Sequence, residues 1–354
     1  MALRKILVIR FSAMGDVVLL VPVIRALVAA YDDVEVTVVT RPKFASFFTD
    51  IDRVIPYPAD VDYTYTGILG MRDLFGKLMR RAGYDVVIDM HDHMRTIILR
   101  SLFKLFGVKV VVFTKGRPEK KQFTRKEDKN TQRLPHTVER YRQAFVNAGF
   151  DRITLTEPAP YFSVKSQSQE QLETWLGEKS LSKDRQWIGI APFAAHVSKV
   201  WPEGNYFKVI EEWLSNHNSK FFLFGGGEKD IKFFETLKER FPEHVVIVAG
   251  ELKIKQELAL MQMLDLMLCV DSSNMHLAAL SGTKLLSIWG GTHPDVGFGP
   301  YNCDDQSILQ ISREVLPCRP CSVYGTEKCY RGDFACLTFI KPEDVVKRMS
   351  EALA

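Results

Sequence analysis

The residues best suited to chemistry lie in a polar stretch between two apolar runs, at positions 271–276. The apolar run Leu266–Val270 is typical of a buried strand that delivers Asp271 to its end, and Ser272–Asn274 then open a helical pattern. A helix N-terminus offers free N–H groups and the positive end of the helix dipole, which suits a phosphate. His276 adds a further donor near this turn. The stretch predicts a phosphate-binding turn; a well-capped helix with a core histidine is the alternative.

Two further polar turns follow predicted strands in the same half of the chain. Lys199 comes after the strand Trp187–Ala191 and could reach a diphosphate as a point charge, or could be a solvated surface lysine. Gly225–Gly227 end the strand Lys220–Phe224 and permit close backbone approach to a ligand, but the Gly-Lys-Ser/Thr ending of a P-loop is missing. Glu228 could accept hydrogen bonds from ribose hydroxyls, or could simply be an acid in the first turn of a helix.

The first half of the chain offers one candidate base. The segment Arg10–Asp16 follows a predicted strand, Ile6–Arg10, and opens a helix. Asp16 stands where a helix N-cap is expected, and capping alone would explain it. A carboxylate at a strand end could also take a proton from an acceptor hydroxyl. Only one glycine is present here, so the segment is not a dinucleotide fingerprint.

The elements that must position these residues alternate between short β-rich runs and helical patterns. Near-continuous apolar strands separated by helices predict parallel sheets covered on both faces, in two doubly wound α/β units. Ligands of such sheets bind beyond the carboxyl ends of the strands, and we expect the cleft between the two units to be the site. The stretch Glu157–Gln171, rich in Pro, Ser and Gln, is the predicted linker. The remaining predicted strands are Val34–Val39, Val54–Tyr57, Asp85–Met90, Val108–Phe113, Val245–Ala249 and Leu285–Trp289.

Length and charge agree with two soluble domains. The chain has 354 residues, more than one hydrophobic core usually organises. Its net charge of +4 is mild, which argues against a nucleic-acid binder and allows an acidic substrate. The first apolar run is too short to cross a bilayer, and the run Val17–Ala30 is interrupted by Pro22 and Arg25. We therefore expect a cytoplasmic protein that could touch the inner membrane surface peripherally.

Lysine and arginine are concentrated between Lys115 and Arg133. This stretch holds eight basic residues against three acids and almost no apolar side chains, which predicts an exposed basic loop. Such a loop could meet an anionic acceptor at a membrane face, or be merely solvated.

Four of the six cysteines crowd near the C-terminus, with the spacing Cys-x2-Cys-x7-Cys-x6-Cys. Four thiolates could bind a structural zinc ion tetrahedrally, although this is not a common finger spacing. Free thiols and disulfides are the alternatives. The four residues are Cys318, Cys321, Cys329 and Cys336.

The segments described above resemble the heptosyltransferase family, glycosyltransferase family 9. The likeness rests on Lys5–Asp16, Asp271–Ala279 and Gly290–Pro294, and the segments Tyr84–Arg95 and His136–Tyr141 are also similar. It extends over nearly the whole chain. Where the family usually has Gly-Pro-Thr this chain has Gly-Gly-Thr, and Ser273 replaces a usual glycine; Ala194 and Ala195 stand where hydroxyl residues are frequent.

The resemblance implies a GT-B fold, in which two Rossmann-like doubly wound parallel-sheet domains face a central cleft. The expected boundaries are an acceptor domain over 1–160, a nucleotide-sugar donor domain over 161–340, and a helix over 341–354 that packs back on the first domain. The implied reaction is an inverting, metal-independent transfer of a heptose from an ADP-sugar to the inner core of lipopolysaccharide, an anionic glycolipid, with no cofactor required. The alternatives are another GT-B nucleotide-sugar enzyme, with a different donor or an epimerase activity, or a non-catalytic nucleotide-sugar-binding protein.

The family motifs also imply roles for individual residues. Asp16 matches the catalytic base. The donor-binding residues expected are Lys199, Gly226, Glu228, Asp271, Ser272, Ser273 and His276. The acceptor-binding candidates are Ser12, Met14, Arg117, Lys120 and Lys121.

Overall fold

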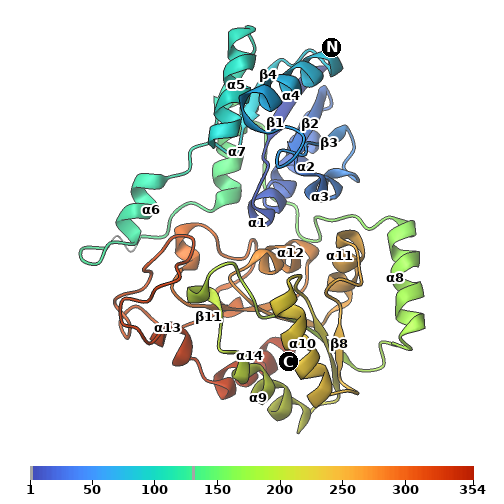
Figure 1. The fold of residues 1–354 in the computed structure, drawn as a ribbon, viewed down its shortest axis with the longest axis vertical. Helices are drawn as coiled ribbons and strands as arrows, with labels where there is room; N and C mark the ends of the chain where they lie inside the picture. Colours follow the sequence, from blue (N-terminus) through green and yellow to red (C-terminus); the bar gives the residue numbers. More distant parts are fainter. Residues whose placement is uncertain (1–2, 130–131) are drawn as a thin grey trace. The chain divides into compact units, whose positions relative to one another are not determined.

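The computed structural model describes residues 3–129 and 132–354, and the chain forms two compact units (Figure 1). Unit 1 contains the residues up to Lys115 and the segment Thr137–Glu157. Unit 2 contains Gly116–His136 and Pro158–Ala354. The segment 116–136 therefore belongs to unit 2 although it interrupts unit 1 in the sequence.

Unit 1 is built on a five-stranded, fully parallel sheet in the order β3-β2-β1-β4-β5. The central strand β1 is buried from Ile6 to Ile9, which explains its unbroken apolar sequence. The chain winds outward from β1 to β3 and then returns to β4 on the other side of β1. The strands are β1 (Arg4–Ile9), β2 (Val34–Thr40), β3 (Val54–Pro58), β4 (Val86–Asp89) and β5 (Lys109–Val112).

Helices cover this sheet with apolar faces at helical spacing. Helix α4 (Gly67–Arg81) buries Met71, Leu74, Phe75 and Leu78, which recur three or four residues apart and so form one stripe. That stripe packs with α5 on the core of Leu7, Ile9 and Val87 and their neighbours. The other helices of unit 1 are α1 (Met14–Val18), α2 (Val21–Ala30), α3 (Pro42–Ala45), α5 (Met94–Leu105) and α7 (Thr137–Ala148), with a 3-10 turn η1 (Ser46–Phe48).

Unit 2 is built on a six-stranded, fully parallel sheet in the order β11-β10-β9-β6-β7-β8. Its inner strands are buried on both faces; every residue of β9 and of β10 is buried. The strands are β6 (Gln186–Ala191), β7 (Ser219–Leu223), β8 (Val245–Ile247), β9 (Leu266–Val270), β10 (Leu285–Trp289) and β11 (Ile308–Gln310). Both predicted sheets are thus confirmed, and the edge strand β11 was not predicted.

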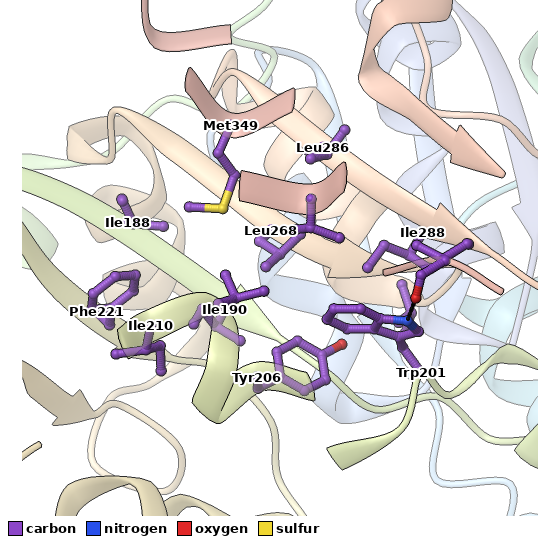
Figure 2. Packing of buried hydrophobic residues seen from close by; sticks show 14 of the residues in the cluster. Ile188, Ile190, Trp201, Tyr206, Ile210, Phe221, Leu268, Leu286, Ile288 and Met349 are labelled. Carbon is purple, nitrogen blue, oxygen red and sulfur yellow. Dashed lines mark hydrogen bonds between the residues drawn. The ribbon is translucent and has the colours of Figure 1, made fainter. Parts of the chain in front are cut away.

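An extensive hydrophobic core lies on one face of the unit 2 sheet (Figure 2). Trp201 and Tyr206 pack edge to face at 5.1 Å, and the Trp201 indole donates to the carbonyl of Ile340 at 3.2 Å. The C-terminal helix α14 adds Val345 and Met349 to the same core. The helices of unit 2 are α6 (Arg117–Phe123), α8 (Ser166–Glu178), α9 (Glu203–Leu214), α10 (Glu228–Arg240), α11 (Ile254–Met263), α12 (Ser273–Ser281), α13 (Ala335–Thr338) and α14 (Pro342–Leu353), with 3-10 turns η2 (Val197–Lys199), η3 (Pro294–Val296) and η4 (Asp305–Ser307).

Three expectations about segments differ from the structure. The predicted linker ends early, because Ser166–Glu178 forms α8, whose Leu172, Trp175 and Leu176 are buried beside α11. The last helix packs against α9, β9 and β10 of unit 2, because its apolar stripe completes that core, whereas we expected it on the first domain. The basic stretch 115–133 is not a simple exposed loop: it contains α6, and its residues 130–131 lie outside the described part. No helix in the described residues combines the length and apolar content needed to span a bilayer.

Candidate functional site

Three of the predicted site residues, Lys199, Asp271 and Asp16, follow strands at the switch points of the two sheets. In unit 2 the neighbouring strands β6 and β9 are separated in sequence, because the chain reverses its direction of winding between them. Such a reversal leaves a crevice beyond the carboxyl ends of the two strands, where ligands of open α/β sheets bind. Lys199 follows β6 and Asp271 follows β9. In unit 1 the reversal lies between β1 and β4, and Asp16 follows β1.

Lys199, Asp271 and Thr292 form a connected polar group at the carboxyl edge of the unit 2 sheet. Lys199 Nζ lies 2.9 Å from Asp271 Oδ2, and the Thr292 hydroxyl donates to the same oxygen at 2.7 Å. The side chains of Lys199 and Asp271 are only 15% and 8% exposed, so water screens the pair little. Asp271 therefore fixes the ammonium beside the start of α12. Thr292 lies in the turn Gly290–Pro294, which contributed to the family resemblance, but no individual role was assigned to it from the sequence.

The N-terminus of α12 offers donors that no side chain satisfies. Ser272 is the N-cap residue in extended geometry, and no side-chain hydrogen bond caps the helix. The Ser272 hydroxyl is buried and has no hydrogen-bond partner within the described structure. Ser273 begins the helix, and His276 lies in its first turn with 6% of its surface exposed. First-turn amides, the helix dipole and an unused hydroxyl together favour an anion at this position.

The glycine turn after β7 lies at the same edge of the sheet, because β7 is the neighbour of β6. The Gly226 amide donates to Asp230 Oδ2 at 3.0 Å, so this N–H is already used within the protein. A Cβ on Gly225 would lie 2.8 Å from the same oxygen, which explains that glycine. Glu228 is the exposed first residue of α10, open to a ligand. Asp230 was missed, although an acid three residues after a glycine N-cap signals such a capping arrangement.

A buried arginine holds the turn that contains Thr292. The Arg319 guanidinium donates to the carbonyls of Gly290 at 2.7 Å, Thr292 at 3.1 Å and Trp289 at 3.2 Å, and also to the carbonyl of Ile311. Burial lowers the pKa of Arg319 to about 10, so it stays protonated at neutral pH. Sequence reasoning gave no sign of this contact, which joins positions 29 residues apart.

Asp16 lies in the first turn of α1 and is paired with a buried arginine. Arg10 Nη2 is 2.5 Å from Asp16 Oδ2, while Arg10 Nη1 donates to the carbonyl of Met90 at 2.5 Å. The Asp16 side chain is 28% exposed, and the Tyr141 hydroxyl donates to its backbone carbonyl at 3.2 Å. Asp16 is not the N-cap as expected; Ala13 holds that position. The ion pair orients the Asp16 carboxylate.

His91, which follows β4, was missed as a residue of this edge of unit 1. Burial, with a contribution from the charges of Arg10, His93, Lys115 and Arg41, lowers its pKa to about 3. Its ring stacks on His93 at 5.3 Å and meets Phe11 edge-on at 6.0 Å. The edge near Asp16 therefore presents a neutral imidazole surrounded by cationic side chains, a setting that suits a polar, anionic ligand.

Comparison with known proteins decides the family. The profile of glycosyltransferase family 9 (heptosyltransferase) matches residues 72–327, which is more than half of the chain. The chain belongs to glycosyltransferase family 9. It is thus a glycosyltransferase with the GT-B fold, as the resemblance implied.

Relatives of this family 9 chain match it over most of its length. It is 26% identical over 300 residues to the lipooligosaccharide heptosyltransferase 2 of Haemophilus influenzae, covering 81% of each protein. The family 9 glycosyl transferase structure from Veillonella parvula aligns with a TM-score of 0.76 at 18% identity, over 100% of this chain and 98% of that one. The Escherichia coli heptosyltransferase WaaC with ADP-2-deoxy-2-fluoro heptose aligns with a TM-score of 0.63 at 18% identity, over 98% and 99%. At these identities the two structures support the fold.

The acceptor candidates of this family 9 enzyme divide between the two units. Ser12 and Met14 are half-buried in unit 1, beside Asp16 in the chain. Arg117 and Lys121 are exposed on α6 of unit 2. Lys120 was expected to be exposed, but it is only 4% exposed, because its ammonium lies 4.1 Å from the centre of the Phe298 ring. A buried cation of this kind holds α6 in place and is not available to a glycolipid.

For the four C-terminal cysteines, zinc binding was one of the possibilities left open by the sequence. In residues 3–129 and 132–354, no three His, Cys, Asp or Glu side chains are placed to hold a metal ion. Two of the four thiols have other neighbours. Cys321 Sγ lies 3.5 Å from the carbonyl of Gly291, and Cys336 is buried in the apolar core at the start of α13. All four remain unbridged thiols.

A buried histidine of the family 9 enzyme predicts a pH dependence of stability. His293 Nδ1 accepts hydrogen bonds from the Asp295 amide at 3.2 Å and from Arg313 at 3.0 Å, so it must be neutral. Burial, with a contribution from the charges of nearby arginines, lowers its pKa to about 3. The folded-state pKa is below the unfolded value, so this stability is present above about pH 6.5 and is lost as the pH falls toward 3. We expect His293 to make the free energy of unfolding about 1.4 kcal/mol lower at pH 5.5 than at pH 7.5.

Urea unfolding followed by tryptophan fluorescence would measure this effect, because all five tryptophans lie in unit 2 with His293. The His293→Gln variant should lose less stability than the wild type between the two pH values. Equal losses in both proteins would show that another group carries the dependence.

Proposed function

We propose that this glycosyltransferase moves a heptose from ADP-heptose to the inner core of lipopolysaccharide, with inversion at the anomeric carbon and without a catalytic metal. The observation that carries the proposal is the Lys199–Asp271–Thr292 group at the switch point of unit 2, beside the uncapped N-terminus of α12. A diphosphate needs such a cationic, amide-lined position when it leaves. The alignment with a heptosyltransferase carrying an ADP-heptose analogue, and the heptosyltransferase relatives, support the choice of donor.

In this proposal unit 2 binds the donor and unit 1 binds the acceptor. Asp16 takes the proton of the acceptor hydroxyl, whose oxygen forms the new bond to the anomeric carbon while the bond to the β-phosphate oxygen breaks. Lys199 and the first-turn amides of α12 stabilise the charge on the departing ADP. Glu228, at the start of α10, is proposed to accept hydrogen bonds from the ribose, and His276 to donate to the phosphates.

An assay of transfer from ADP-heptose tests the proposal. We expect transfer to an inner-core acceptor, undiminished after dialysis against EDTA, with opposite anomeric configurations in donor and product by NMR. A loss of activity in EDTA that added divalent cation restores would contradict metal independence. Sugar conversion without an acceptor would instead indicate an epimerase, and binding without turnover would indicate a binding protein.

We also propose that the enzyme works at the cytoplasmic membrane face, with unit 1 touching the lipid surface that carries the acceptor. Large apolar side chains are exposed near the carboxyl edge of its sheet: Tyr63 is 87% exposed, and Ile68 and Leu69, in the first turn of α4, are 70% and 78% exposed. Asp62, next to Tyr63, pairs with Arg41 and with Arg95 of the first turn of α5. Exposed apolar side chains flanked by arginines suit an anionic membrane interface.

The Leu69→Ser variant is expected to bind anionic vesicles about fivefold to tenfold less tightly in a sedimentation assay, because one leucine side chain no longer enters the interface. Leu105→Ser is the matched control. Leu105 is 80% exposed, but it lies at the C-terminal end of α5, at the other edge of the sheet. Equal vesicle binding by the two variants would contradict the proposed surface.

A further inference from the structure

The four C-terminal cysteines line one cavity of unit 2, which the proposed transfer reaction does not use. Cys318, Cys321, Cys329 and Cys336 share the cavity wall with cationic side chains. The cations are Arg319, Lys328 and Arg331. A cavity that gathers four thiols among positive charges favours thiolate chemistry.

Within this cavity Cys329 is the thiol best prepared to react. It is half-buried between the exposed residues Lys328 and Tyr330, so small solutes can reach it. Cys336, by contrast, is buried. An accessible thiol beside three others can be oxidised and then resolved by a neighbour.

The cavity wall is joined to the donor site through short hydrogen bonds. The Cys321 amide donates to the Gly291 carbonyl at 3.0 Å, and the Gly291 amide donates to the Ser198 carbonyl at 2.8 Å. Ser198 in turn exchanges hydrogen bonds with Thr326, donating from its amide at 3.1 Å and accepting at its hydroxyl at 2.8 Å. Ser198 and Gly291 immediately precede Lys199 and Thr292 in the chain, the two residues that hold Asp271.

The turn that contains Gly290 and Gly291 packs closely against Ser198 and Cys321. A Cβ on Gly291 would lie 3.0 Å from the Ser198 side chain and 3.1 Å from Cys321 Sγ. A Cβ on Gly290 would lie 2.3 Å from the Ser198 carbonyl. Any shift of the 321–326 segment must therefore move Ser198 or Gly291, and with them the donor-binding lysine or threonine.

We propose that this cavity is a thiol-oxidation site, where a hydroperoxide oxidises Cys329 and a second cavity thiol closes a disulfide that weakens donor binding. The Cys329 sulfur attacks the peroxide, the O–O bond breaks, and a sulfenic acid and water form. The second thiol attacks the sulfenic sulfur, the S–S bond forms, and hydroxide leaves with the thiol proton as a second water. Two thiols lose two electrons in total, and one hydroperoxide gains them. A cytoplasmic thiol pair would return to the reduced state through small-molecule thiols.

The effect on donor binding rests on the proposed function; the disulfide itself does not. The test treats the full-length protein with hydrogen peroxide, maps disulfides by mass spectrometry without reduction, and measures ADP binding by calorimetry. We expect one disulfide that includes Cys329, a loss of ADP affinity of about fivefold or more, and recovery with dithiothreitol. The Cys329→Ser variant should keep its ADP affinity after peroxide. Cys303→Ser, a half-buried thiol outside this cavity, should behave as the wild type.

Several results would overturn the inference. A peroxide-treated protein without a disulfide at Cys329, or a disulfide that leaves ADP affinity unchanged, would do so. Stoichiometric zinc that protects the four thiols in the purified protein would do so as well. If the reduced protein fails to bind ADP, the proposed donor site is wrong, and the disulfide map still decides whether this cavity is an oxidation site.

Discussion

The Asp16→Asn variant is expected to transfer sugar about 10³-fold more slowly than the wild type while binding ADP equally well. Asparagine keeps the size of the side chain and an oxygen that can accept from Arg10, but it cannot take a proton. The choice of asparagine over alanine matters, because alanine would leave the buried Arg10 guanidinium without its carboxylate, which destabilises a protein strongly. Steady-state kinetics with ADP-heptose, together with calorimetry of ADP binding, measure the two effects separately.

One control supports the interpretation of that result. Asp16→Glu keeps a base but moves it, so its rate should lie between those of the wild type and the asparagine variant. Near wild-type turnover by Asp16→Asn would rule out Asp16 as the base.

The Lys199→Met variant is expected to bind ADP about 10- to 100-fold more weakly, because a charge-assisted contact to phosphate contributes roughly 1.5–3 kcal/mol. Methionine preserves much of the length of the buried stem and removes the charge. Lys229→Met is the matched control, since Lys229 stands exposed in the first turn of α10 with its side chain 76% exposed. Calorimetry should show a large loss for the first variant and little change for the second.

A double-mutant cycle with Asp271→Asn separates direct from indirect effects at the same site. If Lys199 contacts the phosphate itself, Lys199→Met should still weaken ADP binding when Asp271 has already been replaced by asparagine. If its only task is to neutralise Asp271, the double variant should bind ADP as well as Asp271→Asn alone. The second outcome would contradict the proposed phosphate contact.

The sequence predicted the strands and the switch-point residues because both signals are local. Val270 and Asp271 show the change from buried strand to polar turn within two positions, and parallel sheets place such turns at one edge. The three segments that differed depend on distant partners. Lys120 looks solvated in the sequence because Phe298, the ring that receives it, lies 178 positions away. The apolar stripe of α14 could equally cover either sheet, and only the free space over β9, β10 and α9 decides.

The same reasoning explains which site residues were missed. In the sequence, Thr292 and Asp230 look like ordinary turn residues, and only the fold shows the hydrogen bonds that they make. Arg319 is likewise one of many basic residues in the sequence, and its carbonyl partners are brought to it only by the fold. The cysteine spacing suggested a metal, but spacing alone does not fix the direction in which each thiol points. Cys321 faces a backbone carbonyl, and Cys336 faces the core.

The insertion of residues 116–136 has a consequence for dissecting this enzyme. The chain passes from one unit to the other after Lys115, after His136 and again after Glu157, so neither unit is a single continuous piece. A fragment ending at Glu157 would carry α6 away from Val296, the unit 2 residue against which Phe123 and Leu134 are buried. The two units should therefore be expressed separately only with residues 116–136 excised from the first half of the chain and joined to the second.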